Sequence, residues 1–216
     1  MTEPENARNR LVWLAAGVLW LAAVGVGLAV VARYGNTAGA AASAPDQWPA
    51  TSRIARDTAR PTLVMMAHPL CTCTRASLAE LGEIMARAAH RPRAYVVFIS
   101  PERFSGGDLR DLWERAARIP GVTIVRDEKG IEARTFGAWT SGQVFLYDRH
   151  GRLIFSGGAT GSRGHEGDNA GRAAILALLS DAPPDLTGTS VFGCSLFAST
   201  EEVEADESTH HDHHHN

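Results

Sequence analysis

Residues 62–85 read TLVMMAHPLCTCTRASLAELGEIM, and this stretch decides the fold. Its first part, Thr62–Ala67, is a short apolar run, which predicts a strand covered on both faces of a sheet. His68-Pro69-Leu70 ends that run. Further on, apolar residues recur at three- and four-residue spacings, at positions 78, 81, 84 and 85, which predicts a helix over 73–89. Cys71 and Cys73 are therefore expected where a buried strand leads into a helix.

The start of a helix favours the ionised form of a cysteine, because unpaired backbone N–H groups and the helix dipole stabilise a negative charge there. The thiolate is the nucleophile and the metal ligand of cysteine chemistry. Two accessible thiols at positions 71 and 73 thus indicate redox chemistry or soft-metal binding. The plainer alternative is that Cys71 and Cys73 are small buried apolar residues, as free cysteines often are.

In the redox interpretation, Cys71 attacks a substrate disulfide and Cys73 resolves the mixed disulfide. A bridge across the single residue Thr72 requires Cys71 to lie off the helix, because helical positions two apart point in different directions. His68 is an auxiliary candidate: an imidazolium lowers the pKa of a nearby cysteine, and a neutral ring binds metal, although a surface histidine in a loop has the same sequence signature.

Cys194 is the odd third thiol. It is expected as a redox partner that exchanges with the other two cysteines, as a third metal ligand, or as a packed core residue. It lies in the apolar island Val191–Phe197, which we expect to pack against the domain because an exposed run of this kind would be sticky. A glycine-rich loop at 157–167 contains Arg163 and His165, two candidates for a substrate surface.

Residues 11–32 form 22 consecutive positions without a charge. About 20 apolar residues span a bilayer. A secretory signal has a shorter apolar region, of roughly 7–15 residues, so an uncleaved anchor is the favoured interpretation. Small residues at 38–44 nevertheless leave cleavage as an alternative.

Arginines at positions 8 and 10 precede the span and Arg33 follows it. By the positive-inside rule, residues 1–10 are expected in the cytoplasm. The protein is then a single-pass protein of the cell inner membrane whose domain faces the periplasm, where disulfides persist. The alternative is a cytoplasmic domain with reduced thiols.

The chain of 216 residues is long enough for one domain with appendages, and its net charge is −3. Its basic residues are scattered and form no stripe, so no nucleic-acid partner is expected. The expected parts are the anchor 11–32, a linker 33–60, a compact domain 61–182, a C-terminal extension 183–198 with Cys194, and a disordered acidic and histidine-rich tail 199–216. The histidines of that tail can bind Zn, Ni or Cu loosely.

Further elements follow the first strand and helix. Strands are predicted at 93–100, 122–125, 143–148 and 152–156, with helices after an N-cap at Asp108, over 129–136, and after an N-cap at Asp168. This order predicts an α/β domain with helices on both faces of a mixed sheet and an antiparallel hairpin at one edge.

A strand, two close cysteines and a helix resemble the thioredoxin-like superfamily. Residues 136–154, FGAWTSGQVFLYDRHGRLI, resemble a stretch of its membrane-anchored, extracytoplasmic TlpA/ResA-like branch, and the extra helix and strand around 108–126 fit that branch. RedB-type proteins have a similar Cys-x-Cys context. Over residues 60–180, the resemblance implies a thioredoxin-like thiol–disulfide oxidoreductase that acts on protein thiols and disulfides without a bound cofactor.

The chain departs from the family pattern at two places. Thr72 alone separates the cysteines, where the family has two residues. The family also places a cis-proline before the hairpin, opposite the cysteines, and here Gly142 takes that position; glycine adopts unusual angles without fixing them. The resemblance makes Ser141 and Gly142 candidate substrate-binding residues.

Two rival functions stay open. A thioredoxin-fold copper carrier would use Cys71 and Cys73, with His68 or Cys194, as ligands, because thiolates suit Cu(I). A non-catalytic interaction module would explain the missing cis-proline. The redox interpretation itself requires no metal.

Overall fold

A computed structural model describes residues 3–100 and 110–197. It divides the chain into two compact units, Met1–Thr37 and Ala38–Asn216. The loop expected at 101–107, the N-cap expected at Asp108 and the disorder expected for 199–216 lie outside the described residues.

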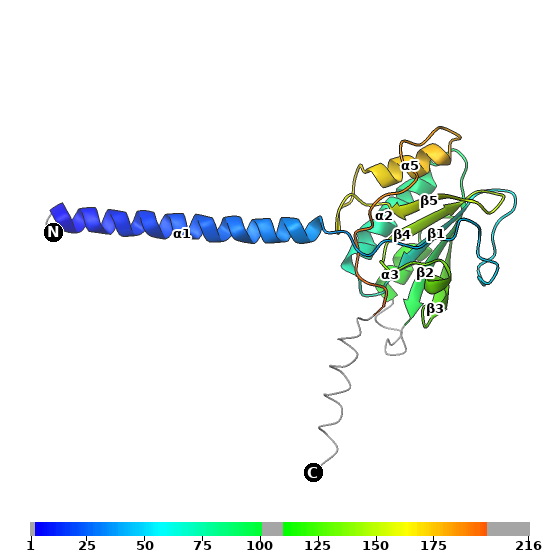
Figure 1. Cartoon of the computed structure of the whole chain (residues 1–216), viewed down its shortest axis with the longest axis horizontal. Helices are drawn as coiled ribbons and strands as arrows, with labels where there is room; N and C mark the ends of the chain where they lie inside the picture. The colour runs from blue at the N-terminus through cyan, green and yellow to red at the C-terminus, as the bar shows by residue number, and fades with distance from the viewer. Residues whose placement is uncertain (1–2, 101–109, 198–216) are drawn as a thin grey trace, which may run out of the picture. The chain divides into compact units, whose positions relative to one another are not determined.

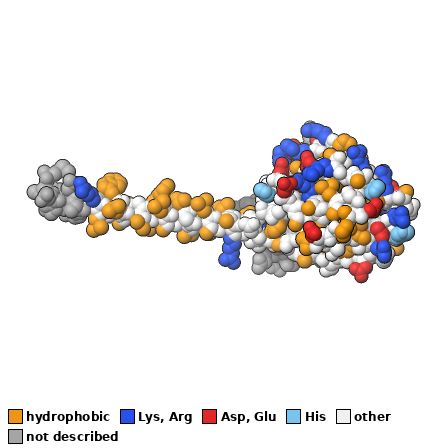
Figure 2. All heavy atoms as spheres, turned by 90° about the horizontal axis from the view of Figure 1, so that it is seen from above, with side chains coloured by type: hydrophobic (Ala, Val, Ile, Leu, Met, Phe, Trp, Pro, Cys, Tyr) orange, Lys and Arg blue, Asp and Glu red, His pale blue; other side chains and the backbone are white. Residues whose placement is uncertain are grey.

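The first unit is one long helix, α1 (Glu3–Gly35). Its segment Asn9–Gly35 has 27 residues and contains an 18-residue window with a mean hydropathy of 2.4. At about 1.5 Å per residue this segment measures about 40 Å, more than the roughly 30 Å of a bilayer's hydrocarbon core. Hydrophobic side chains are exposed along this helix (Figure 2). The helix is therefore long and apolar enough to cross a membrane.

The second unit is built on a five-stranded sheet of order β3-β2-β1-β4-β5 (Figure 1). Strand β1 pairs in parallel with β2, and β2 with β3; β4 is antiparallel to both β1 and β5. The strands are β1 (Thr62–Ala67), β2 (Arg93–Ser100), β3 (Val122–Glu128), β4 (Gln143–Tyr147) and β5 (Leu153–Gly158). All five lie where the sequence predicts them, and β4 and β5 form the expected hairpin.

Strand β1 is buried along its whole length, because each face of the sheet is covered. Leu63 and Met65 join one core with helix residues such as Leu81, while Val64 and Met66 join the core on the other face. The helices are α2 (Thr72–Arg87), α3 (Arg110–Ala117), α4 (Ile131–Thr135) and α5 (Ala170–Leu178). The mixed sheet with helices on both faces confirms the predicted α/β, thioredoxin-like fold class.

Residues 38–60, which fall in the expected linker, lie against the sheet. The backbone N–H of Trp48 donates to the carbonyl of Gly151 at 2.7 Å. The Trp48 ring meets Phe136 and Tyr147 edge-on, with centroid distances of 5.2 Å to each. Trp48 and the buried Ile54 of this segment thus help to cover the second face of the sheet.

The N-cap of α5 is Asn169, so the prediction of Asp168 is wrong by one residue. The Asn169 side chain accepts a hydrogen bond from the backbone N–H of Arg172 at 2.8 Å. The carboxylate of Asp168 pairs instead with the Arg172 guanidinium. That guanidinium also bonds the buried Glu80 of α2 at 2.6 Å, so the polar start of α5 is tied to α2.

Candidate active site

Cys71 lies at the junction between β1 and α2, at the N-cap position of the helix. Its backbone N–H donates to the carbonyl of His68 at 3.2 Å, and its own carbonyl accepts from the N–H of Thr74 at 3.0 Å. Its φ of −80° and ψ of 115° are extended rather than helical. Cys71 therefore lies outside the helix, as expected from the sequence, and α2 begins at Thr72.

The sulfur of Cys71 receives hydrogen bonds from several donors. The backbone N–H of Cys194, 123 residues away in sequence, donates to Cys71 Sγ at 3.4 Å. Burial alone would raise the pKa of Cys71, but hydrogen bonds from the Cys194 thiol and from the amides of Cys194, Cys73 and Thr74 outweigh it and lower the pKa. The local setting therefore favours a thiolate at Cys71.

The other two sulfurs stay protonated beside that thiolate. Burial raises the pKa of Cys73, and the charge and hydrogen bond of Cys71 raise it further. Burial, followed by the same effects of Cys71, raises the pKa of Cys194 to about 12. The positive charge of Arg163 opposes both shifts without reversing them. All three cysteines are free. The site therefore contains one sulfur whose pKa is lowered, Cys71, and two thiols that donate hydrogen bonds to it, Cys73 and Cys194.

The expectation of accessible sulfurs at positions 71 and 73 is wrong in this conformation. Cys71 is 1% exposed and Cys73 is 7% exposed, whereas Cys194 is partly exposed. The C-terminal extension contacts Cys71 through the backbone N–H of Cys194, and its residues Val191 and Leu196 are buried, as expected for the apolar island. The extension therefore closes the site over Cys71.

Backbone contacts hold the extension beside residues 139–141. The N–H of Ser141 donates to the carbonyl of Cys194 at 2.9 Å, and the N–H of Leu196 donates to the carbonyl of Trp139 at 2.9 Å. Gly193 passes so near that a Cβ at this position would lie 1.9 Å from the Ser141 carbonyl oxygen. Only glycine permits this approach.

Ser141 and Gly142 lie at the site, where they form hydrogen bonds with the backbone of the β1–α2 junction at Met66 and His68. Gly142 has a φ of +88°, and its N–H donates to the carbonyl of Met66 at 2.8 Å. The buried Ser141 hydroxyl accepts from the N–H of His68 at 2.9 Å and shares a hydrogen bond with the Thr74 hydroxyl at 2.9 Å. No cis peptide bond occurs at residues 3–100 or 110–197. Substrate binding by these two residues stays a prediction.

His68 contributes mainly through its backbone. Burial lowers its pKa, which favours a neutral ring. The ring Nδ1 accepts a hydrogen bond from the N–H of Leu70 at 3.2 Å, an arrangement that also suits the neutral form. The expectation that an imidazolium lowers the pKa of Cys71 is therefore wrong, because hydrogen-bond donors from three other residues do so.

Two further residues take part that the sequence analysis missed or placed differently. Arg163 Nη1 donates to the carbonyl of Gly193 at 2.6 Å, so it holds the extension rather than an open substrate surface, while His165 is exposed in the same loop. Thr74 was not predicted at all. A hydroxyl three residues after a helix-capping position was the available signal, but its buried partner Ser141 is 67 residues away.

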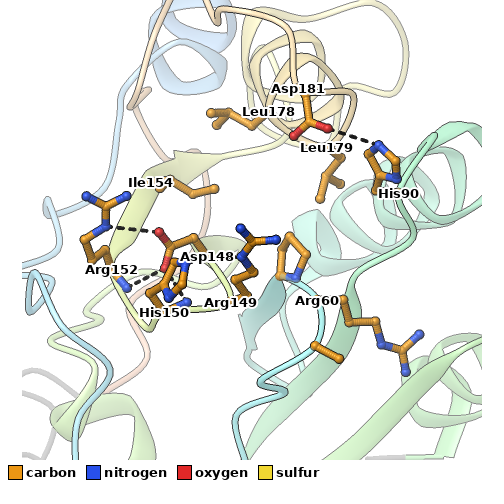
Figure 3. Close-up of a pocket in the computed structure, with 12 residues that line it drawn as sticks. Arg60, His90, Asp148, Arg149, His150, Arg152, Ile154, Leu178, Leu179 and Asp181 are labelled. Atoms are coloured by element: carbon orange, nitrogen blue, oxygen red, sulfur yellow. Dashed lines mark hydrogen bonds and ion pairs between the residues drawn. The ribbon is translucent and has the colours of Figure 1, made fainter.

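Within the part of the chain that the structure describes, no three or more His, Cys, Asp or Glu side chains are grouped so that they could hold a metal ion. A cavity of about 610 Å³ lies elsewhere, lined by charged residues such as Arg60 and Asp148 and by apolar ones such as Leu178 (Figure 3). It opens at the start of β1, whereas Cys71 follows the end of that strand, about 20 Å further along at roughly 3.3 Å per residue. The cavity is therefore separate from the cysteine site.

No protein-family model matches the chain, and comparison with curated proteins finds no match. Among solved structures, an uncharacterized conserved protein from Geobacillus kaustophilus is 17% identical, with a TM-score of 0.55 over 76% of this chain and 94% of its own. A hypothetical protein from Sinorhizobium meliloti is 21% identical, with a TM-score of 0.54 over 74% of this chain and 98% of its own. The exposed lipoprotein thioredoxin of Streptococcus pneumoniae is 19% identical, with a TM-score of 0.42 over 56% and 84%. The first two likenesses show a shared fold, and the sheet order and connectivity make that fold thioredoxin-like.

Proposed function

We propose that this protein is a thiol–disulfide oxidoreductase of the membrane-anchored TlpA/ResA-like kind, with Cys71 as its essential sulfur. The observation that carries the proposal is the hydrogen bond from the backbone N–H of Cys194 to Sγ of Cys71, the N-cap residue of α2. Such donors stabilise a thiolate, and thiolates perform disulfide exchange. The pKa of Cys71 is lowered despite its burial, which is the direction that this chemistry requires.

The proposed reaction exchanges one disulfide for another. When a substrate disulfide is reduced to two thiols, two electrons leave the protein and two of its cysteine sulfurs form a disulfide; the reverse direction oxidises two substrate thiols. Cys71 is one member of the protein pair, and Cys73 is the other member that the sequence predicts. The substrates are protein thiols and disulfides, and the cycle uses no bound cofactor.

The proposed location is the cell inner membrane, with residues 1–10 in the cytoplasm and the domain in the periplasm. The length and hydropathy of α1 support an anchor. An oxidising compartment supports the chemistry, because disulfides persist there.

The test compares wild-type protein with Cys71→Ser in an assay that follows reduction of a protein disulfide by a thiol reductant. Arg149→Ala, in the distant cavity, is the matched control for purification and folding. We expect Cys71→Ser to reduce the rate to that of the buffer and Arg149→Ala to keep it. A Cys71→Ser protein that works at the wild-type rate would exclude the proposed function.

A further inference from the structure

We infer that Cys194 of the C-terminal extension is the redox partner of Cys71, and that Cys194 is the sulfur that meets the substrate. The inference rests on the proposed function and identifies its second sulfur. It replaces Cys73, the partner expected from the sequence, with a residue 123 positions away from Cys71.

Cys194 is held beside Cys71 by its own backbone. Its N–H donates to Cys71 Sγ at 3.4 Å, and its carbonyl accepts from the N–H of Ser141 at 2.9 Å. The preceding residue, Gly193, accepts a hydrogen bond from Arg163 at 2.6 Å. Both polar groups of the Cys194 backbone are thus used to place this residue, which indicates a built contact between the two cysteines.

Cys73 is less suited to a bridge with Cys71 because the first turn of α2 constrains both residues. The Thr74 N–H bonds the Cys71 carbonyl at 3.0 Å, and the Ser77 hydroxyl bonds the Cys73 carbonyl at 3.3 Å. Cys71 lies outside the helix, and the Cys73 thiol hydrogen-bonds to it. A 71–73 disulfide would nevertheless close across Thr72 alone, with Cβ atoms about 3.5–4.5 Å apart, while the two hydrogen bonds above hold this turn in its present shape. A 71–73 bridge therefore requires this turn to be reshaped. Cys194 lies on a separate segment and can form a bridge without changing the helix.

Exposure separates the roles of the two sulfurs. Cys194 is partly exposed, while Cys71 is 1% exposed. In the oxidised protein, an incoming substrate thiolate therefore attacks Cys194 Sγ, forming a bond between Cys194 and the substrate. The Cys71–Cys194 bond breaks, and its electron pair leaves with Cys71, whose thiolate receives hydrogen bonds from the backbone amides of Cys194, Cys73 and Thr74. A sulfur with a lowered pKa is the better leaving group.

A second substrate thiolate then attacks the substrate sulfur of this mixed disulfide. The substrate disulfide is released, and Cys194 leaves with the electron pair and takes up a proton. Two substrate thiols have lost two electrons, and the Cys71–Cys194 disulfide has gained them. A disulfide such as oxidised glutathione restores the protein disulfide by the reverse exchange.

Peptide mapping of the full chain tests the inference. The protein is equilibrated in glutathione buffers of increasing oxidised fraction, free thiols are blocked with N-ethylmaleimide, and trypsin is added without reduction. Trypsin cuts after Arg56, Arg75 and Arg172 and does not cut before Pro61, so Cys71 and Cys73 share the peptide 57–75 and Cys194 lies in 173–216. Mass spectrometry then separates a bridge inside one peptide from a bridge between the two.

We expect the two peptides to be linked in the wild type, in Cys73→Ser and in the control Ser190→Ala, an exposed residue of the same extension, and to be separate in Cys194→Ser. In Cys71→Ser, glutathione should become attached to Cys194. A bridge within 57–75, or preferential attachment at Cys73, would overturn the inference and leave the proposed function intact. A wild type that forms no disulfide at any glutathione ratio would overturn both.

Discussion

Replacing Gly193 with alanine should open the site over Cys71. A Cβ at position 193 would lie 1.9 Å from the carbonyl oxygen of Ser141, whereas real Cβ contacts are not shorter than 3.0 Å. The clashing atom is a backbone oxygen, which cannot rotate away as a side chain could. The extension must therefore move by about 1 Å, the difference between those two distances. That displacement weakens the backbone hydrogen bonds that Cys194 and Leu196 exchange with residues 139–141.

The size of the effect follows from those bonds. Each contributes about 0.5–1.5 kcal/mol net, so losing two removes about 2 kcal/mol from the free energy that keeps the extension closed. Since about 1.4 kcal/mol corresponds to a factor of ten, the open population rises about 30-fold. Cys71 is modified only when exposed, so its alkylation rate should rise by the same factor when opening is fast and reversible.

The assay follows alkylation of reduced protein by iodoacetamide at pH 7, with mass spectrometry to assign the label to Cys71. Gly161→Ala is the matched control, because a Cβ there would meet its nearest neighbour at an ordinary 3.6 Å. We expect Gly161→Ala to keep the wild-type rate. If folded Gly193→Ala protein labels Cys71 no faster than the wild type, the extension does not control access to this sulfur.

Three further outcomes are expected. Gly142→Ala should lower the free energy of unfolding by about 1–2 kcal/mol because an alanine is strained at a φ of +88°. A further loss should come from the clash of the new Cβ with Ser77 Oγ, 2.8 Å away. Denaturant unfolding of the double variant Gly142→Ala/Ser77→Ala should recover the loss from the clash but not the loss from the backbone strain. Because the pKa of Cys71 is lowered on folding, the unfolded chain binds more protons between that pKa and the ordinary thiol value of 9.0. The pH-dependent part of the stability lost in Cys71→Ser should therefore grow with pH across this window and vanish below it, as measured by unfolding at several pH values. Treatment with EDTA and a Cu(I) chelator should leave thiol–disulfide exchange unchanged, and a loss of activity that copper restores would favour a metal-dependent function instead.

Local patterns predict the fold of the second unit well. The apolar run at 62–67 and the helical spacing after it place Cys71 at a strand-to-helix junction, and the structure confirms this junction. The sequence does not predict the exact N-cap of α5, because the neighbouring residues Asp168 and Asn169 are both good capping residues. In the structure the Asp168 carboxylate pairs with Arg172, and Asn169 caps the helix. A local ion pair four residues apart, rather than capping propensity, distinguishes the two residues.

The chemistry of the site depends on contacts that no local pattern contains. A helix start alone predicts an ionised and accessible sulfur, yet burial opposes ionisation of Cys71 and is the largest single influence on its pKa. The lowered pKa exists because the extension adds the Cys194 amide and thiol to the donors from α2. The segment that contacts Cys71 therefore also supplies the hydrogen bonds that lower its pKa. Opening the extension removes both influences at once, so access to Cys71 and the stability of its thiolate are properties of one contact and cannot be changed independently.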